Sequence, residues 1–361
     1  MNELSLRTPL HAAHVRASGK MVTFAGYDMP VQYDGGIIAE SKAVRTGAGM
    51  FDVSHMARLN LVGERVFEYL EWVTTNDVSK LSDGVGQYSL LPNDQGGVVD
   101  DIIVYRLREH EYVMVVNAAN HAKDVAWLNR QNQFDVQMTD NTDASAMIAV
   151  QGPRATEILA GLSGDGEAMR AAPLFGLLNT QISGVSVLAA RSGYTGEDGF
   201  ELICPAEESE KLWNALVEAG VVPCGLGARD VLRVEAGLPL YGHELTDELS
   251  PLTAGLGWVI SKTKSFVGAE FVQAARASGT PTKLFGIKMN SRRIPAPDMV
   301  VSAGGRQIGS MSSGVYSPLL ECGIGFAFLA PDTTIGQEIT VNIRGAEEPG
   351  SVVQKRFMKR G

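Results

Sequence analysis

Two adjacent aspartates, Asp100 and Asp101, stand in an otherwise apolar run that reads VVDDIIVY. Side chains along a β-strand point alternately to opposite faces, so a strand here directs one carboxylate into the protein interior. A buried carboxylate is costly unless it meets hydrogen-bond donors, a cation or a polar ligand. The pair is therefore either a candidate for acid-base or electrostatic chemistry, or a structural acid satisfied by backbone amides of the preceding turn.

A second candidate is the glycine-bracketed segment GYTGEDGFE, residues 193–201. Its glycines, at positions 193, 196 and 199, allow the backbone to approach a flat ligand closely. Glu201 would lie on the following strand, where a carboxylate can accept two parallel N–H bonds from the amidine-like edge of a heteroaromatic ring. The alternative interpretation is a hairpin with Glu201 exposed.

The segment GLGARDVLRVEAGLPLYGHEL, residues 225–245, predicts a short helix with a charged start. Asp230 and Arg233 are three residues apart and can pair on its surface. The spacing that pairs Asp230 with Arg233 leaves Arg229 outside the pair. Its guanidinium is therefore available to bind a carboxylate or carbonyl of a ligand. A solvated charged face is the alternative.

Motifs for most other enzyme chemistries are missing from the sequence. It contains no GxxxxGK[ST], GxSxG or HExxH pattern, and the glycines at 193–199 lead into a strand instead of opening a helix. Of the six histidines, only His11 and His14 have metal-ligand spacing, and they lie near a terminus. His55, in FDVSHM, is interpreted as a buried, hydrogen-bonded histidine. We therefore predict no metal, and acid-base chemistry by carboxylates remains.

The composition is that of an ordinary globular protein with room for two or three domains. The chain has 361 residues, of which 45% are hydrophobic and 20% charged, which excludes a disordered or collagen-like protein. The formal net charge of −10 disfavours phosphate backbones and anionic lipid as partners, so we predict no nucleic acid and no membrane.

The cysteines and the N-terminal segment indicate the cellular compartment in which the protein is expected. Cys204, Cys224 and Cys322 are odd in number and far apart, which fits neither a disulfide framework nor a CxxC-type metal site. The chain has no apolar window of about 18 residues and no apolar stretch typical of a signal peptide near its start. We therefore expect a soluble, cytoplasmic protein.

The hydrophobic periodicity predicts helices alternating with antiparallel strand pairs over the first 220 residues. Helices are predicted over residues 37–46, 64–73 and 118–129, and three consecutive strands between residues 87 and 117. A doubly wound parallel sheet would need a helix after every strand, so the fold class predicted is α+β with antiparallel sheets.

The character of the chain changes after residue 280. Strand-like runs at residues 284–289, 299–302, 307–312, 324–330 and 338–343 are separated by Gly, Pro and Ser clusters without a helical pattern. This pattern predicts a small all-β barrel or jelly roll at the C-terminus.

Taken together, these segments resemble the T-protein (aminomethyltransferase) family of the glycine cleavage system. The similarity is carried by KMVTFAGYDMPVQY, GMFDVSHM, NDQGGVVDDIIVYR, VVNAAN, MIAVQGP, SGYTGEDGFEL, PCGLGARDVLRVEAGLPLYGHEL, GLGWVI and SPLL, in this order along nearly the whole chain.

The resemblance implies a ring of three domains around a central cavity that holds tetrahydrofolate. Domain 1 would comprise residues 1–50 and 141–265. Domain 2, an antiparallel α+β unit, would comprise residues 51–140, and domain 3, a β-barrel, residues 280–361.

The resemblance also implies the reaction. An aminomethyl group on the lipoyl arm of the partner H-protein is split, ammonia leaves, and the one-carbon unit passes to tetrahydrofolate, the co-substrate, as 5,10-methylenetetrahydrofolate. No metal takes part. The pocket must exclude water, because an iminium-like one-carbon species would otherwise hydrolyse to formaldehyde.

The family motifs assign site residues by position. The functional acid is Asp101, expected to turn inward beside the pterin and to tune the folate amine by charge and orientation. The pterin-binding glutamate falls on Glu201, with Tyr194 nearby, and the substrate-contacting arginine on Arg229. Asn117, Met56 and Tyr88 are carried over as pocket lining. The chain ends QKRFMKRG where family members often have a Lys-Pro-Phe type segment.

The H-protein and polyglutamylated folate must approach an acidic molecule. Since charges are screened beyond about 8 Å at physiological salt, a local basic patch suffices. We hypothesise that Lys262, Lys264, Arg292 and Arg293 form it.

Two related functions are alternatives. A tetrahydrofolate-dependent demethylase of a small methylated amine or sulfonium would share the pocket. A non-catalytic folate-binding relative would be expected to carry a cysteine near Tyr194 and to lack the DD strand, and this chain shows neither departure.

Overall fold

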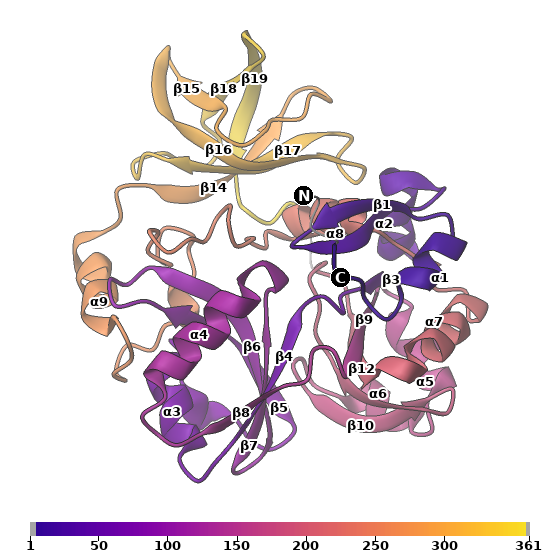
Figure 1. The fold of residues 1–361 in the computed structure, drawn as a ribbon. Coiled ribbons are helices and arrows are strands. Elements are labelled where there is room, and N and C mark those ends of the chain that lie inside the picture. Colours follow the sequence, from indigo (N-terminus) through magenta and orange to yellow (C-terminus); the bar gives the residue numbers. More distant parts are fainter. Residues whose placement is uncertain (1–4, 359–361) are drawn as a thin grey trace. The chain divides into compact units, whose positions relative to one another are not determined.

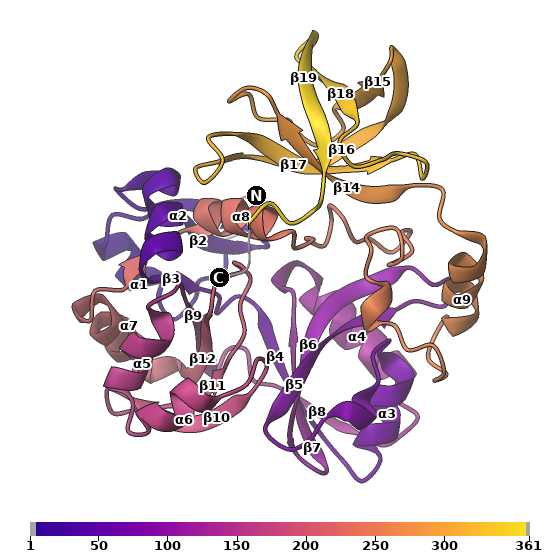
Figure 2. The ribbon, with the colours of Figure 1, turned by 180° about the vertical axis from the view of Figure 1, so that it is seen from behind.

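The computed structural model describes residues 5–358, whose helices and strands are shown in Figures 1 and 2. The chain divides into two compact units. Unit 1 comprises Met1–Leu70, Val78–Tyr88 and Ile102–Arg229, and unit 2 comprises Glu71–Asp77, Ser89–Asp101 and Asp230–Gly361. Strands β5 (Val85–Pro92) and β6 (Val98–Arg108) run from one unit into the other. Asp101 therefore belongs to unit 2, whereas the next residue along β6 belongs to unit 1.

Unit 1 contains a six-stranded sheet with the order β10-β11-β12-β9-β3-β13. Its strands are β3 (Gly49–Asp52), β9 (Ser145–Gln151), β10 (Leu177–Ile182), β11 (Val185–Ala190), β12 (Gly199–Pro205) and β13 (Val222–Pro223). The neighbouring pairs run antiparallel except β13, which pairs parallel to β3. The register places Glu201 of β12 opposite Ala190 of β11 and Ala149 of β9.

One face of this sheet is covered by helices α5 (Ala155–Leu162), α6 (Gly166–Ala171) and α7 (Ser209–Glu218). Alternate strand residues such as Ile148 and Leu202 pack against Leu159 of α5 and Leu212 of α7, and all four are fully buried. The buried face of the strands, which repeats every second residue, thus packs against the apolar faces of α5 and α7 in a single core.

The second sheet has the order β5-β6-β7-β4-β8, with β4 (Ala57–Val62), β7 (Glu111–Val116) and β8 (Gln137–Asp140) completing it. The three consecutive strands predicted between residues 87 and 117 are therefore confirmed as neighbours. Helices α3 (Val66–Val73) and α4 (His121–Gln131), the latter preceded by the short turn Ala118–Asn120, lie beside this sheet (Figure 1). Tyr69 of α3 donates a hydrogen bond of 2.8 Å to the Leu128 carbonyl of α4.

The N-terminal part of unit 1 contains elements that the periodicity did not reveal. Helix α1 (His11–Arg16) and the hairpin of β1 (Lys20–Phe24) and β2 (Tyr27–Gln32) precede the predicted helix, which is found as α2 (Gly36–Thr46). A buried chain of hydrogen bonds fixes α1. His14 lies between Asp52 and the Tyr33 hydroxyl, at 2.8 Å from each, and Thr8 donates to Asp52 at 2.6 Å.

The all-β C-terminus is confirmed as a closed barrel of the order β14-β17-β16-β15-β18-β19 in unit 2. Its strands are β14 (Lys283–Met289), β15 (Val300–Ala303), β16 (Arg306–Ser317), β17 (Cys322–Leu329), β18 (Glu338–Ile343) and β19 (Ala346–Val353). The interior is apolar, with Ile287, Val341 and Val352 completely buried. The connection before the barrel carries helix α9 (Ala269–Ser278).

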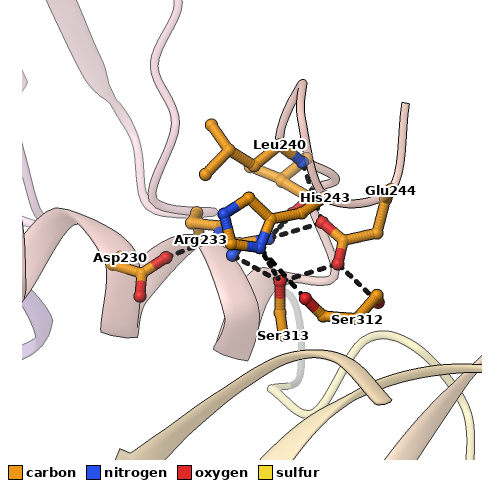
Figure 3. A network of polar contacts seen from close by, with 8 residues as sticks. Asp230, Arg233, Leu240, His243, Glu244, Ser312 and Ser313 are labelled. Carbon is orange, nitrogen blue, oxygen red and sulfur yellow. Dashed lines mark hydrogen bonds and ion pairs between the residues drawn. The ribbon is translucent and has the colours of Figure 1, made fainter. Parts of the chain in front are cut away.

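The part of helix α8 (Leu226–Ala236) that belongs to unit 2, from Asp230 onwards, is fixed by a buried ion pair (Figure 3). Arg233 pairs with Asp230 at 2.8 Å, as the spacing predicted, and also with Glu244 at 2.9 Å. Ser312 and Ser313 of β16 each donate to Glu244 at 2.6 Å. The helix, the segment after it and the barrel are thereby joined around one carboxylate.

Among residues 5–358, every helix is too short or too polar to cross a lipid bilayer. The α+β class and the C-terminal barrel agree with the sequence. The ring around a central cavity and the limits of the three predicted domains stay predictions.

Candidate functional site

Glu201 is placed in the interior of unit 1 by strand β12, with 4% of its surface exposed. The Ser192 hydroxyl donates a hydrogen bond to its Oε2 atom. Burial raises the pKa of Glu201, while the Ser192 hydrogen bond and the charge of Arg229 act in the opposite direction. The exposed hairpin alternative is therefore wrong, because β12 lies inside the sheet and turns this side chain inward.

Arg229, near the start of α8, lies close to two other residues predicted for the site, Tyr194 and Met56. Its guanidinium carbon lies 4.9 Å from the centre of the Tyr194 ring, and its Nη2 atom lies 3.9 Å from the Met56 sulfur. Burial lowers the pKa of Arg229, and the charge of Glu201 opposes that shift. The Nη1 atom is buried and has no hydrogen-bond partner among residues 5–358, so it retains a donor for a ligand.

The loop that carries Tyr194 is held by a fully buried glutamine. Gln151 donates to the Ser192 carbonyl at 2.9 Å and accepts from the Thr195 hydroxyl at 2.8 Å. A Cβ atom on Gly193 would lie 1.8 Å from the Gln151 Oε1 atom, so only glycine fits this close approach. Arg45 of α2 donates to the Thr195 carbonyl at 2.8 Å. Tyr194 thus projects from a loop of fixed shape.

The two aspartates point to opposite faces of β6, as the strand period requires. Asp100 is completely buried, whereas Asp101 is partly exposed. Both faces of β6 are covered, because Val99 and Tyr105 on the Asp101 face are almost completely buried, so the expectation that Asp101 turns inward beside a ligand stays a prediction. The face that carries Asp101 also carries Tyr105.

His55, next to Met56, is buried as interpreted, with 4% of its surface exposed. Its ring meets Phe24 edge to face at 5.7 Å, but its Nδ1 atom has no hydrogen-bond partner within residues 5–358. Burial lowers the pKa of His55 to about 4, and the charge of Arg229 contributes to the shift. His55 is therefore a neutral ring at physiological pH.

The remaining predicted residues lie on the five-stranded sheet. Tyr88 is on β5, and Asn117 follows the last residue of β7; both are partly exposed. Their part in a ligand site stays a prediction.

The hypothesis of a four-residue basic patch is wrong for Lys264. This side chain is 10% exposed, donates to the Asn76 carbonyl at 2.5 Å and lies 3.5 Å from Glu71. Burial lowers its pKa to about 8. Arg293 is 56% exposed and pairs with Glu348 at 3.2 Å, and Lys262 and Arg292 lie at the surface.

Two hollows open elsewhere on unit 1. One of about 350 Å³ is bordered by Arg58, Asn60 and Cys204, and the other lies over the hairpin of β10 and β11. Arg58 is fully engaged there, since its guanidinium donates to carbonyls of Ser54 and Thr142. Within residues 5–358 no group of three or more His, Cys, Asp or Glu side chains could hold a metal ion.

Sequence reasoning missed Ser192, Gln151 and Tyr105 as parts of this site. Ser192 lies one residue before the glycine-bracketed segment, and Gln151 lies in the MIAVQGP motif. Tyr105 shares a strand face with Asp101, so the period of two could have pointed to it.

The fold and the site define a class of protein. It is an α+β protein with a C-terminal barrel, in which unit 1 carries a buried carboxylate and an arginine that lies beside an aromatic ring and has a buried donor without a partner among residues 5–358.

Comparison with known proteins identifies the family to which the chain belongs. Residues 10–264 match the model of the GCVT N-terminal domain, and residues 283–359 match that of the glycine cleavage T-protein C-terminal barrel domain. The chain belongs to the glycine cleavage T-protein family.

Relatives of high similarity cover the chain almost completely. An aminomethyltransferase of Thermus thermophilus is 46% identical over 356 residues, covering 98% of this chain and 99% of the relative. That of Geobacillus kaustophilus is 43% identical over 361 residues, again 98% and 99%. The crystal structure of glycine cleavage system aminomethyltransferase T from Bartonella henselae has a TM-score of 0.91 at 31% identity and covers 98% of both chains.

Proposed function

We propose that this protein is the aminomethyltransferase of a glycine cleavage system, with tetrahydrofolate as its co-substrate and the lipoylated H-protein as its partner. The observation that carries the proposal is the full-length similarity to relatives of that name, at 46% and 43% identity. The arrangement of Glu201, Arg229 and Tyr194 in unit 1 supports it.

The reaction requires no net oxidation or reduction. The carbon–sulfur and carbon–nitrogen bonds of the aminomethyl group break, and two new carbon–nitrogen bonds form to the two amines of the folate. One of the two amine protons released goes to the lipoyl sulfur and the other to the departing ammonia. Residues that hold the reactants and move these protons are therefore sufficient for catalysis.

The donor set in unit 1 fits a reduced pterin. When bound, tetrahydrofolate supplies the two amines that accept the carbon unit. Glu201 would accept two N–H bonds from the pterin edge as a carboxylate, and the unpartnered Nη1 donor of Arg229 would meet a carbonyl or carboxylate. Tyr194 and Met56 add an aromatic face and an adaptable thioether beside the guanidinium. Asn117 and Tyr88 are proposed as further lining.

Asp101 is proposed as the catalytic acid residue, acting through its charge. The Asp101 side chain is partly exposed on β6. As a carboxylate it would orient the attacking amine and stabilise positive charge that develops on it, instead of donating a proton.

We also propose a cytoplasmic location. Cys204, Cys224 and Cys322 are buried, free thiols, as is typical of proteins from a reducing compartment.

The experiment that tests the function compares two donors. The purified protein is given tetrahydrofolate with aminomethylated H-protein, and separately with dimethylsulfoniopropionate, which a demethylase would use. We expect ammonia and 5,10-methylenetetrahydrofolate with the first donor and no methylated folate with the second. Methyl transfer from the sulfonium without ammonia release from the H-protein would establish the demethylase instead.

A further inference from the structure

We propose that Tyr105 and Ser192 form a two-hydroxyl relay that positions the Glu201 carboxylate for its ligand. Tyr105 and Ser192 are thus positioning residues, which act on the ligand only through Glu201. The inference rests on the proposed role of Glu201 in binding the pterin.

The relay is a directed chain of hydrogen bonds in the interior of unit 1. The Tyr105 hydroxyl donates to the Ser192 oxygen at 3.1 Å, and the Ser192 hydroxyl donates to Glu201 Oε2. Because the serine oxygen accepts from the tyrosine, its own hydrogen is left for the carboxylate. All three side chains are at least 95% buried, so water does not substitute for either bond.

Tyr105 is held in place by a glycine on the neighbouring strand. A Cβ atom on Gly86 of β5 would lie 2.3 Å from the Tyr105 ring, so the ring occupies space that only glycine leaves free. Tyr105 belongs to the five-stranded sheet and Glu201 to the six-stranded sheet. The relay therefore links the Glu201 carboxylate of the six-stranded sheet to a residue of the five-stranded sheet.

Ser192 is held by its backbone. Its carbonyl accepts the 2.9 Å hydrogen bond from Gln151, whose side chain is completely buried. The close approach of Gly193 to the same side chain fixes the next peptide as well. The serine hydroxyl consequently reaches Glu201 from a rigid position and loses little entropy in doing so.

The relay also favours the charged form of Glu201. The groups that act on this carboxylate are the Ser192 hydroxyl, the Arg229 guanidinium from α8 and the Tyr105 hydroxyl from β6. Burial raises the pKa of Glu201, and Ser192 and Arg229 lower it. Burial and the charge of Glu201 raise the pKa of Tyr105, so its hydroxyl stays a donor at every pH of interest. Without the serine bond, Glu201 becomes protonated at a higher pH and loses one acceptor oxygen for the pterin.

The test measures KM for tetrahydrofolate and kcat against pH in four variants of the full chain. Ser192→Ala is expected to raise KM about tenfold at neutral pH with kcat within about threefold, and to shift the acid limb of the KM profile to higher pH. Tyr105→Phe is expected to act in the same direction by a smaller factor, about threefold. Ser192→Thr, which keeps the hydroxyl, is expected to restore the wild-type profile. An unchanged KM profile in Ser192→Ala would overturn the proposal.

A matched control separates positioning from general destabilisation. Tyr69→Phe removes another buried tyrosine hydroxyl of unit 1, the 2.8 Å donor to the Leu128 carbonyl. We expect it to lower the melting temperature as much as Tyr105→Phe while leaving the folate KM profile unchanged. An equal rise of KM in Tyr69→Phe would mean that the effect is structural, and the proposal would fall.

A second measurement tests the relay independently of the proposed function. The protonation of Glu201 is followed by infrared difference spectra of the carboxyl band, with Glu201→Gln as the reference. If the wild-type protein forms no methylenetetrahydrofolate, the proposed function fails, and the infrared titration alone decides the relay. A higher titration midpoint in Ser192→Ala than in wild type supports it, and equal midpoints contradict it.

Discussion

Burial disfavours the charged forms of both Glu201 and Arg229. It raises the pKa of the acid and lowers that of the guanidinium, and each charge opposes the shift of the other. Each residue therefore favours the charged form of the other. Because Glu201→Gln keeps the shape and removes one acceptor, we expect the folate KM to rise at least tenfold, or about 1.4 kcal/mol, as measured by steady-state kinetics. A folate KM like that of wild type would exclude Glu201 from the binding site.

Asp101 differs from Glu201 in that its charge is expected to matter for turnover. Asp101→Asn keeps the size of the side chain, so kcat should fall at least about tenfold while the dissociation constant of tetrahydrofolate stays within about twofold. Rapid-quench turnover and equilibrium binding measure the two quantities. Asp100→Asn is the comparison, because the buried position should cost stability instead. Near-normal turnover in Asp101→Asn would contradict the role.

The buried Asp52 predicts a specific loss of stability in acid. Hydrogen bonds from His14, Ser54 and Thr8 hold its pKa at about 2, although burial alone would raise it. Its unfolded pKa is about 3.9, so its contribution, about 2 kcal/mol, is complete above that pH and is lost as the pH falls towards 2. Urea unfolding at pH 6 and pH 3 should therefore show a smaller pH dependence in Asp52→Asn than in wild type. The exposed Asp34→Asn is the control, and equal slopes for Asp52→Asn and wild type would refute the assignment.

At the level of elements, α8 shows how a surface pair and a buried pair differ. Asp230 is 47% exposed, whereas Glu244 is completely buried and also accepts from two barrel serines. We expect Glu244→Gln to lower the free energy of unfolding by about 3–5 kcal/mol, because it leaves Arg233 buried beside a neutral partner. Asp230→Asn should cost no more than about 1 kcal/mol. Guanidinium unfolding measures both, and equal losses would contradict the account.

The elements themselves were largely predictable, whereas pairings between strands that are not consecutive in the chain were not. The periods of 3.6 and 2 gave α2, the strands β5 to β7 and the barrel, because one buried face repeats along each. Strands β8 and β9 are consecutive in the chain but belong to different sheets, and nothing in their own pattern says so. The hairpin of β1 and β2 is only partly buried, so it carries a weak apolar signal. Arg233 was correctly paired with Asp230, yet its buried partner, eleven residues further on, follows from tertiary packing alone.

At the level of the whole molecule, the net charge of −10 makes local clusters of cations important for an acidic partner or a folate polyglutamate tail. Lys264 is excluded from such a cluster by burial, which leaves Lys262, Arg292 and Arg293. We expect reversal of these three charges to weaken binding of H-protein at least about fivefold at low salt and to flatten its salt dependence. Titration at several NaCl concentrations measures this.

The control for that prediction reverses three exposed cations of unit 1, Lys20, Lys42 and Arg154, which changes the net charge equally. If both triple variants bind H-protein alike, net charge and not a local patch controls the association. The domain limits predicted at residues 50, 140, 265 and 280 stay predictions, since they concern boundaries within a chain whose two units interleave in sequence.

The stoichiometry of a single turnover tests the central claim most directly. Excess protein is mixed with aminomethylated H-protein and tetrahydrofolate, and ammonia, 5,10-methylenetetrahydrofolate and free formaldehyde are measured together. The account predicts one ammonia and one methylenetetrahydrofolate for each aminomethyl group consumed, with formaldehyde at background. Ammonia accompanied by formaldehyde, without methylenetetrahydrofolate, would contradict it.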